Sequence, residues 1–407
     1  MKKFMDWMSE KVAPLMEKLA NNPWISGLQK AIIKTLPMVL VGSLVTIYNV
    51  IRKFATSIPD LSALSSYTFG LISLFMVFLI PYYILEEKKN NKMKYIAGCT
   101  GISLYMMLVN PVITEAGYVY QFSNFGAGGM FVAITAGLFT AIVFSCFKKM
   151  TFFKEDSVMP DFVKEWFDSM LPIALVVFIG WFVVIQCKFD LYTFIVNLFM
   201  PLVNIAQSWP GMVLLYLIPT VLYSMGISGW VFQPILNPVT LVAITANAEA
   251  AAHYVFTAET TTAFLSLGGR GATFGLVILL ALSKSRRLKA LGTASAVPTL
   301  LNINEPVVFG AVAWNPILMI PMWINAIVLP TITYLVMTFG LITIPSEVFS
   351  MWYCPVGLSA WLVTHDITGI VLFVINLVVS TAIWYPFFKM YEAQEVSKEQ
   401  ERKVENA

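Results

Sequence analysis

Charged residues are scarce in this chain. Only 12% of its 407 residues are Asp, Glu, Lys or Arg, whereas 58% are hydrophobic. An ordinary soluble chain has roughly 25% charged residues. Because so few charges cannot cover a water-soluble globule, the composition excludes a cytosolic enzyme. The net charge of +3 is also too small to indicate a nucleic-acid partner.

Cysteine is rare, and the sequence has no metal-binding pattern. The four cysteines, Cys99, Cys146, Cys187 and Cys354, lie far apart, which excludes a disulfide scaffold. Since there is neither a CxxC pair nor a metal-ligand spacing, we expect no metal site and no cofactor. The 23 Gly and 21 Pro follow no short period, so a collagen-like fold is excluded as well.

Long apolar runs are abundant instead. A membrane-spanning helix needs about 20 mostly apolar residues. The sequence predicts an all-α polytopic membrane protein with about ten transmembrane helices, and an amphipathic surface helix at the N-terminus. The candidate runs are Ala31–Ile51, Tyr67–Leu85, Tyr95–Ile113, Met130–Phe147, Leu171–Cys187, Met212–Tyr223, Thr273–Leu282, Ile317–Ile344, Trp352–Val363 and Ile367–Phe388.

Lys and Arg concentrate in a few short loops. Loops of this kind stay on the cytoplasmic side of a membrane. If the spans alternate in direction, Glu86–Lys94, Lys148–Lys154 and Lys284–Lys289 all fall on one side, together with the N- and C-termini. Arg52 and Lys53 conflict with this order. We therefore expect a multi-pass protein of the cell membrane with both termini in the cytoplasm.

Proline and glycine distinguish two halves of the chain. The spans before residue 190 are plain, whereas those after it are interrupted by many Pro and Gly residues. Proline breaks helices, and broken backbone at membrane depth survives only where protein or a polar cavity surrounds it. Transporters build midplane sites from such segments. We expect residues 1–190 to form a scaffold and dimerisation domain, 191–389 the substrate-binding transport domain, and 390–407 a cytoplasmic tail.

The segment LNINEPVVFG, residues 301–310, carries the clearest chemistry. It places Asn302, Asn304 and Glu305 in an otherwise apolar run. Charged residues at membrane depth are costly and usually functional. Amides and carboxylates suit a polyhydroxylated ligand, and a desolvated carboxylate suits a general base. The structural alternative is a carboxylate that holds a re-entrant turn through backbone N–H groups.

These residues also resemble a known family. N-x-N-E-P-x-x-F-G followed by Asn315-Pro316 is similar to the membrane subunit, enzyme IIC (EIIC), of the bacterial phosphoenolpyruvate:sugar phosphotransferase system. The resemblance is greatest to its lactose/cellobiose/diacetylchitobiose group. GGRGATFGL at Gly268 and SAWLVTHDITG at Ser359–Gly369 extend it, and it covers nearly the whole chain.

The resemblance implies a fold and an activity. It implies a homodimer in the bacterial inner membrane, with a sugar held between two re-entrant hairpins. A phosphorylated EIIB subunit would transfer phosphate to the 6-hydroxyl of the sugar. Glu305 would bind the sugar near that hydroxyl, and the substrate would be a β-linked disaccharide or its N-acetyl relative.

Four residues depart from the group's pattern: Ser228, Arg270, His253 and His365. Ser228 of GISG stands where the group usually has His, and an uncharged hydroxyl cannot carry a proton as imidazole does. Arg270 stands where a small residue is more usual. It is expected either to contact a phosphoryl group or an acidic sugar, or to pair with Glu249 or Glu259. His253 is expected to line a loop or hairpin rather than act in catalysis.

Several other residues complete the predicted site. Trp230 and Trp314 offer aromatic faces for sugar stacking, although Trp is also common at membrane interfaces. Asn237 and Asn315 are expected to contact the substrate. Asp366 is expected to be a helix N-cap, and His365 has no assigned role.

The sequence leaves two other functions open. One is an ion-coupled sugar transporter in which Glu305 is a proton site. The other is a sugar-binding sensor that has lost phosphotransfer, which Ser228 would permit.

Overall fold

The computed structural model describes the chain with a few gaps, over residues 10–11, 14–15, 18, 21–54, 58–115, 117–153, 159–227, 232–349 and 351–405. The described part is mainly helical, as the sequence predicts. Its strands, β1 (Val112–Thr114) and β2 (Gly117–Val119), form an antiparallel pair with Val112 opposite Val119. The N-terminal segment expected to be an amphipathic helix lies almost entirely outside the described residues.

The chain divides into two compact units. The N-terminal unit takes in Lys18–Val203 and Gln233–Pro238, and the C-terminal unit takes in Asn204–Phe232 and Val239–Ala407.

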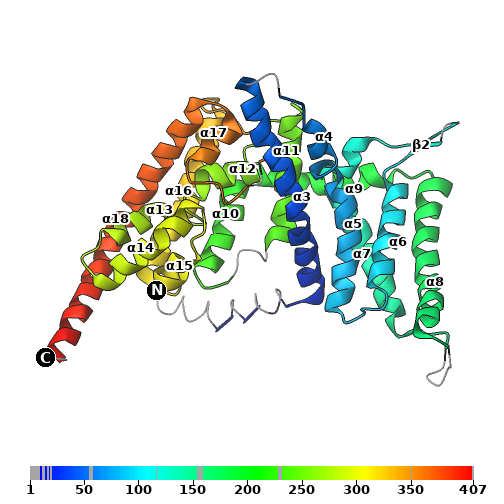
Figure 1. Cartoon of the computed structure of the whole chain (residues 1–407), viewed down its shortest axis with the longest axis horizontal. Helices are drawn as coiled ribbons and strands as arrows, with labels where there is room; N and C mark the ends of the chain where they lie inside the picture. Colours follow the sequence, from blue (N-terminus) through cyan, green and yellow to red (C-terminus); the bar gives the residue numbers. More distant parts are fainter. Residues whose placement is uncertain are drawn as a thin grey trace. The chain divides into compact units, whose positions relative to one another are not determined.

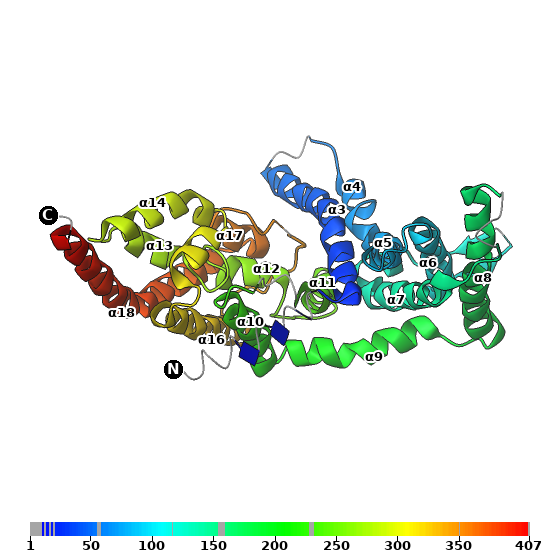
Figure 2. The same ribbon diagram turned by 90° about the horizontal axis from the view of Figure 1, so that it is seen from below.

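Helix α5 is the centre of the N-terminal unit, where it packs against α3, α6 and α7 (Figures 1 and 2). Close approach requires glycine here, because a Cβ at Gly101 would lie 2.6 Å from the carbonyl oxygen of Val77. The helices are α3 (Pro23–Phe54), α4 (Ser62–Ser66), η2 (Phe69–Leu71), α5 (Ile72–Glu87), α6 (Lys94–Leu108), η3 (Phe122–Phe125), η4 (Ala127–Gly129), α7 (Met130–Cys146), η5 (Phe147–Lys149), α8 (Asp161–Gly180), η6 (Trp181–Gln186) and α9 (Leu191–Ala206).

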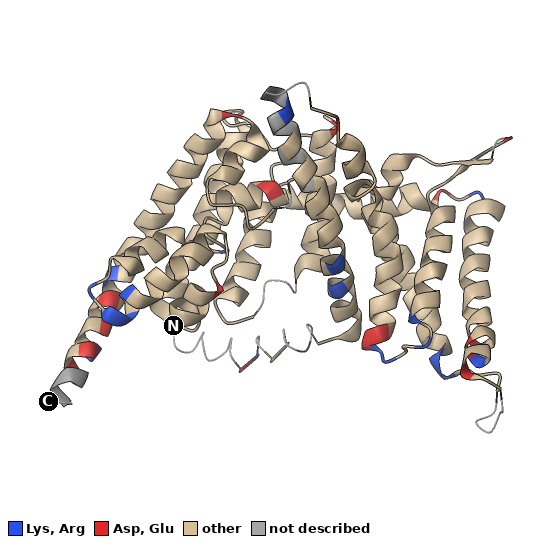
Figure 3. Cartoon of the chain, viewed as in Figure 1, with Lys and Arg blue, Asp and Glu red and all other residues tan. Residues whose placement is uncertain are grey.

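Charge within this unit follows the ends of the helices. Figure 3 shows Lys, Arg, Asp and Glu in the loops at one end of α5, α6, α7 and α8, whereas the bodies of these helices carry almost none. Lys94 pairs with Glu86 across the α5–α6 loop. This is the arrangement that membrane-spanning helices joined by short basic loops would have.

The C-terminal unit is built from shorter and more broken helices. They are α10 (Trp209–Tyr223), α11 (Gln233–Ala248), α12 (Ala258–Thr260), η8 (Thr261–Leu265), α13 (Phe274–Ala281), α14 (Arg286–Leu300), α15 (Glu305–Val307), η9 (Val308–Val312), α16 (Pro316–Thr338), α17 (Leu358–Thr364) and α18 (Ile367–Glu405). α16 packs against α10 and α18, and α13 packs against α14 and α18. Leu276, Leu280, Val307, Met322 and Trp384 lie in the buried core between them.

Six helices of the described chain are long and apolar enough to cross a membrane, or seven if α9 and α10 are counted as one broken span. A helical chain with several spans is therefore confirmed, whereas the predicted number of about ten spans is not. Two of the apolar runs contain short helices: Thr273–Leu282 holds α13 and Trp352–Val363 overlaps α17. Helices of 8 and 7 residues are too short to span a bilayer alone.

Candidate functional site

The site begins with the turn between α14 and α15, which Asn302 holds in place. Asn302 is buried, and its φ of 60° lies in the left-handed region that Asn tolerates. Its Oδ1 accepts the backbone N–H groups of Gly268 (2.9 Å) and Gly269 (3.2 Å). Its Nδ2 donates to the carbonyls of Trp352 (3.1 Å) and Cys354 (3.2 Å). One amide thus joins three segments of the chain.

Asn302 therefore differs from its expected role as a sugar contact. A side-chain amide has two donors and an acceptor oxygen with two lone pairs. The protein occupies all four positions. In this arrangement none is left for a sugar hydroxyl, so the structure makes Asn302 a residue that positions the turn.

Asn304 has a similar part on the other side of the turn. It is buried, and its Nδ2 donates to the carbonyl of Arg270 (2.8 Å) and to the hydroxyl of Thr273 (3.1 Å). Its Oδ1 accepts from the hydroxyl of Tyr223 (3.1 Å). Gly269 leaves room for this amide, because a Cβ there would lie 2.3 Å from Cγ of Asn304. Asn304 is likewise held by the protein rather than directed toward a ligand.

Glu305 is the residue of the motif whose polar group forms no hydrogen bond or ion pair with the described part of the chain. It is the first residue of α15, its side chain is exposed, and no hydrogen bond or ion pair joins its carboxylate to any described residue. The alternative in which Glu305 holds the turn through backbone N–H groups is therefore not what the structure has, because Asn302 does this instead. An unpaired carboxylate on a rigid turn is available to accept hydrogen bonds from hydroxyl groups.

Exposed aromatic side chains follow Glu305 in the chain. Phe309 follows Glu305 by four residues, is 55% exposed, and makes an edge contact with Tyr223 at 5.9 Å between ring centroids. Trp314 is 41% exposed, and its backbone N–H donates to the carbonyl of Ser224 at 3.1 Å. The sequence motif does not single out Phe309 as a site residue, although its place one helical turn after Glu305 could have indicated it.

Arg270 approaches the same turn from the segment before α13. Its guanidinium lies over the ring of Tyr216, with Cζ 5.6 Å from the centroid, and the residue is half-buried. The expected ion pairs do not form: Glu249 is exposed, and buried Glu259 accepts the backbone N–H of Phe349 at 3.0 Å. Arg270 thus joins the site without a carboxylate partner among the described residues.

The remaining predicted site residues are less closely tied to the turn. Asn315 is the N-cap of α16, accepting from the N–H of Ile317 and donating to the carbonyl of Ala311. His253 is exposed in a loop, and Asn237 lies in the part of α11 that belongs to the N-terminal unit. Ser228 and Trp230 lie outside the described residues.

Asp366 and His365 precede the last helix. Asp366 caps α18, because its Oδ1 accepts the backbone N–H of Thr368 at 3.0 Å and its Oδ2 the hydroxyl of Thr343 at 2.8 Å. This confirms the N-cap prediction. His365, which had no assigned role, lies 2.9 Å from a carboxylate oxygen of Glu347.

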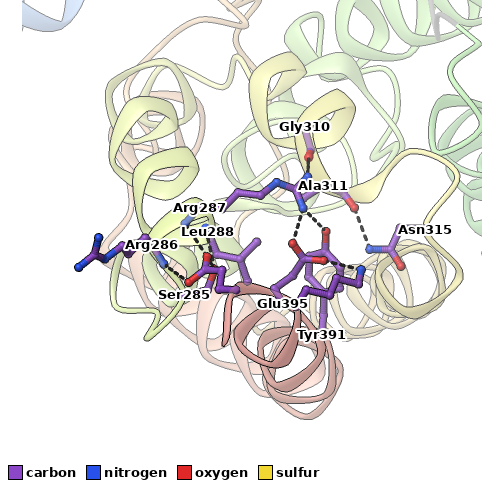
Figure 4. Close-up of polar contacts among 11 residues, drawn as sticks. Ser285, Arg286, Arg287, Leu288, Gly310, Ala311, Asn315, Tyr391 and Glu395 are labelled. Carbon is purple, nitrogen blue, oxygen red and sulfur yellow. Dashed lines mark hydrogen bonds and ion pairs between the residues drawn. The ribbon is translucent and has the colours of Figure 1, made fainter. Parts of the chain in front are cut away.

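Hydrogen bonds and an ion pair join the base of the α13–α14 hairpin to α18. Arg287 donates to the carboxylate of Glu395 and, at 3.4 Å, to the carbonyl of Gly310 (Figure 4). Glu399 accepts the hydroxyl of Ser285 at 2.6 Å and the backbone N–H of Arg287 at 3.1 Å. These contacts place a negative charge at the N-terminus of α14, which its macrodipole favours.

Glu392 extends this arrangement toward α13, accepting from the hydroxyl of Ser283 (2.8 Å) and the N–H of Lys284 (2.7 Å). Glu392, Glu395 and Glu399 share one face of α18 because they are three and four residues apart. Residues 390–405, part of the segment expected to be a cytoplasmic tail, continue α18 to Glu405 and hold the hairpin that leads to Glu305.

Comparisons with known proteins identify the family of the chain. The family model "Phosphotransferase system, EIIC" matches residues 29–326. The oligo-beta-mannoside-specific EIIC component of Bacillus subtilis is 28% identical, covering 98% of this chain and 96% of that protein. The lactose-specific EIICB component of Staphylococcus haemolyticus is 27% identical over all of this chain and 73% of that protein.

A solved structure shares the fold over almost its full length. The crystal structure of ChbC, the IIC component of the N,N'-diacetylchitobiose-specific phosphotransferase system, has a TM-score of 0.85 and 27% identity, and covers 97% of this chain and 99% of that one. EIIC components work with an EIIB component in sugar phosphotransfer. In the lactose-specific EIICB relative the two components are joined in one chain. The chain therefore belongs to the EIIC family of the phosphotransferase system and is a membrane-embedded, multi-pass sugar permease.

Proposed function

We propose that this permease takes a β-linked disaccharide-type sugar and holds the hydroxyl to be phosphorylated at Glu305. The observation that carries the proposal is the contrast within the motif. Asn302 and Asn304 are committed to the protein, whereas the Glu305 carboxylate has no partner among the described residues. The names of the relatives, which refer to oligo-beta-mannosides, lactose and diacetylchitobiose, support this class of sugar.

The chemistry follows from the carboxylate and its surroundings. Glu305 accepts the proton of the sugar hydroxyl while the hydroxyl oxygen takes the phosphoryl group from EIIB. Phe309 and Trp314 offer exposed aromatic faces to the apolar face of the sugar ring. Asn302, Asn304 and Asn315 position the turn and the start of α16. Ser228, Trp230, Asn237 and His253 stay predicted substrate contacts.

The arrangement in the membrane is also a proposal. Residues 1–190 would form the scaffold and the interface of a homodimer, and residues 191–389 the transport domain. The short helices α13 and α15, each next to α14, support re-entrant hairpins, which would account for the difference between six or seven long spans and about ten. The basic loops on one end of the N-terminal unit support cytoplasmic termini in the bacterial inner membrane (Figure 3).

The cytoplasmic face would then contain the α13–α14 turn. The side chains of Lys284, Arg286 and Lys289 are exposed on it. A basic surface of this kind suits an acidic face of phosphorylated EIIB.

Transport into proteoliposomes tests the function. The full chain is reconstituted and given radiolabelled cellobiose, with and without phosphorylated EIIB, and the internal product is identified. We expect sugar phosphate inside only when phosphorylated EIIB is present, and none from Glu305→Gln. Glu249→Gln, which alters an exposed carboxylate away from the motif, is the matched control.

Other products would indicate the other functions. Free sugar accumulated under a pH gradient would indicate an ion-coupled transporter. Binding without flux would indicate a sensor. Full phosphotransfer by Glu305→Gln would contradict the role of Glu305.

A further inference from the structure

Arg270 is a cation whose hydrogen-bonding capacity is unused. A guanidinium has five N–H donors in a planar fork. None of them donates to a described residue, and the guanidinium lies over the ring face of Tyr216. A cation–π contact uses the charge but none of the N–H groups. The donors of Arg270 are thus free for a ligand.

The backbone holds Arg270 in one place. Gly268, Gly269 and Gly271 have φ values of 76°, 100° and 84°, and Ala272 has 54°. The Ala272 carbonyl accepts from Ser380 and from Trp384 Nε1, each at 2.9 Å. A Cβ at any of the three glycines would lie 2.5 Å or less from another residue. Arg270 is therefore the one long side chain on a rigid, closely packed turn.

That turn is joined directly to the motif of Glu305. The carbonyl of Arg270 accepts from Asn304, the residue before Glu305. The hydroxyl of Tyr223, which also binds Asn304, lies within electrostatic range of both the Glu305 carboxylate and the Arg270 guanidinium. The turns that carry Arg270 and Glu305 thus meet at Asn304, and the two side chains form no ion pair with each other.

We propose that Arg270 forms an oxyanion subsite beside Glu305, which binds a carboxylate, sulfate or phosphoryl group. The planar guanidinium matches these groups with paired N–H···O bonds. This rests on the proposal that Glu305 binds the sugar hydroxyl. The oxyanion has two sources: an acidic group of the sugar itself, or the phosphoryl group in transit from EIIB to the hydroxyl.

Binding measurements on the wild-type chain separate these sources. The full chain in nanodiscs is titrated with cellobiose and with cellobiouronic acid, which carries a carboxylate. If the anion belongs to the sugar, the acidic disaccharide binds at least about tenfold more tightly, as a charge-assisted pair predicts. Arg270→Gln removes this preference, and Arg270→Lys restores part of it.

If the anion is the phosphoryl group, the two disaccharides bind alike. Arg270→Gln then lowers the rate of sugar phosphate formation from phosphorylated EIIB by about 100-fold. In either case inorganic sulfate competes with the anion in the wild type: it weakens binding of the acidic disaccharide, or it slows the formation of sugar phosphate. This competition needs no variant and keeps the test valid if Arg270→Gln does not fold.

Three results together overturn the proposal. Sulfate changes neither disaccharide binding nor phosphate transfer in the wild type, the wild type binds the two disaccharides equally, and Arg270→Gln forms sugar phosphate at the normal rate. Glu305→Gln is measured in parallel. Normal phosphorylation by that variant contradicts the proposed function, whereas a normal Arg270→Gln variant contradicts only the oxyanion subsite.

Discussion

The amide of Asn304 donates a hydrogen bond of 2.8 Å to the backbone carbonyl of Arg270, 34 residues earlier in the chain. This bond joins the turn before Glu305 to the glycine-rich turn before α13. Neither turn belongs to a regular helix, so each depends on the other for its conformation.

Asn302 and Glu305 are expected to have opposite effects on stability and chemistry. Asn302→Ala leaves two N–H groups and two carbonyls in the protein without their partner, which costs about 3 kcal/mol. Glu305→Gln removes no contact with a described residue and should change the unfolding free energy by less than about 0.5 kcal/mol. Thermal unfolding in detergent measures both. Equal losses of stability would contradict the division of roles.

Gly269 is expected to be essential for the position of Asn304. Gly269→Ala places a Cβ 2.3 Å from Cγ of Asn304 at a φ of 100°. We expect a loss of about 1–3 kcal/mol from backbone strain, and more from the clash, together with a loss of phosphotransfer.

The matched control for that substitution is Gly340→Ala. Gly340 also has a positive φ, 71°, but no atom lies within 4 Å of the added Cβ. It should lose stability through its backbone alone and keep phosphotransfer. If both variants kept full activity, close packing at Gly269 would not matter for the site.

The contact between Arg287 and Glu395 is expected to stabilise the base of the hairpin modestly. Arg287 is more than half exposed in its side chain, whereas Glu395 is nearly buried. A double-mutant cycle with Arg287→Gln and Glu395→Gln should give a coupling of about 1 kcal/mol that decreases with added salt. The cycle Lys164→Gln with Asp161→Asn, a pair in the N-terminal unit with a longer separation of 3.8 Å and an exposed Asp161, should give less. Additive effects at Arg287 and Glu395 would show that their contact does not hold the hairpin.

Asp366 is expected to make stability depend on acid pH. The backbone N–H of Thr368 and the hydroxyl of Thr343 lower the pKa of Asp366. A carboxyl whose folded pKa is lowered stabilises the protein above its unfolded pKa of about 3.9, and this contribution is lost as pH falls through the folded pKa. The difference in melting temperature between the wild type and Asp366→Asn should therefore be largest near neutral pH. A constant difference down to acid pH would contradict this.

The sequence by itself determined the class of protein and the segment that matters. Scarce charge and long apolar runs require a helical membrane protein, because hydrocarbon accepts only apolar side chains and internally bonded backbone. The Asn and Glu residues at 302–305 stand out for the same reason. Even Asp366 was identifiable as a cap from its place before an apolar helix.

Only the tertiary structure decided what the polar residues of that segment do. Asn302, Asn304 and Glu305 are alike in the sequence as polar groups in an apolar run. The hydrogen-bond partners of Asn302 and Asn304 lie 31 to 81 residues away. Hydrogen-bond partners at such separations are brought together by packing and leave no local pattern. Folding gives the amides of Asn302 and Asn304 hydrogen-bond partners from the backbone and from side chains. The Glu305 carboxylate and the Arg270 guanidinium have no hydrogen-bond partner among the described residues, so these two groups are available to a ligand.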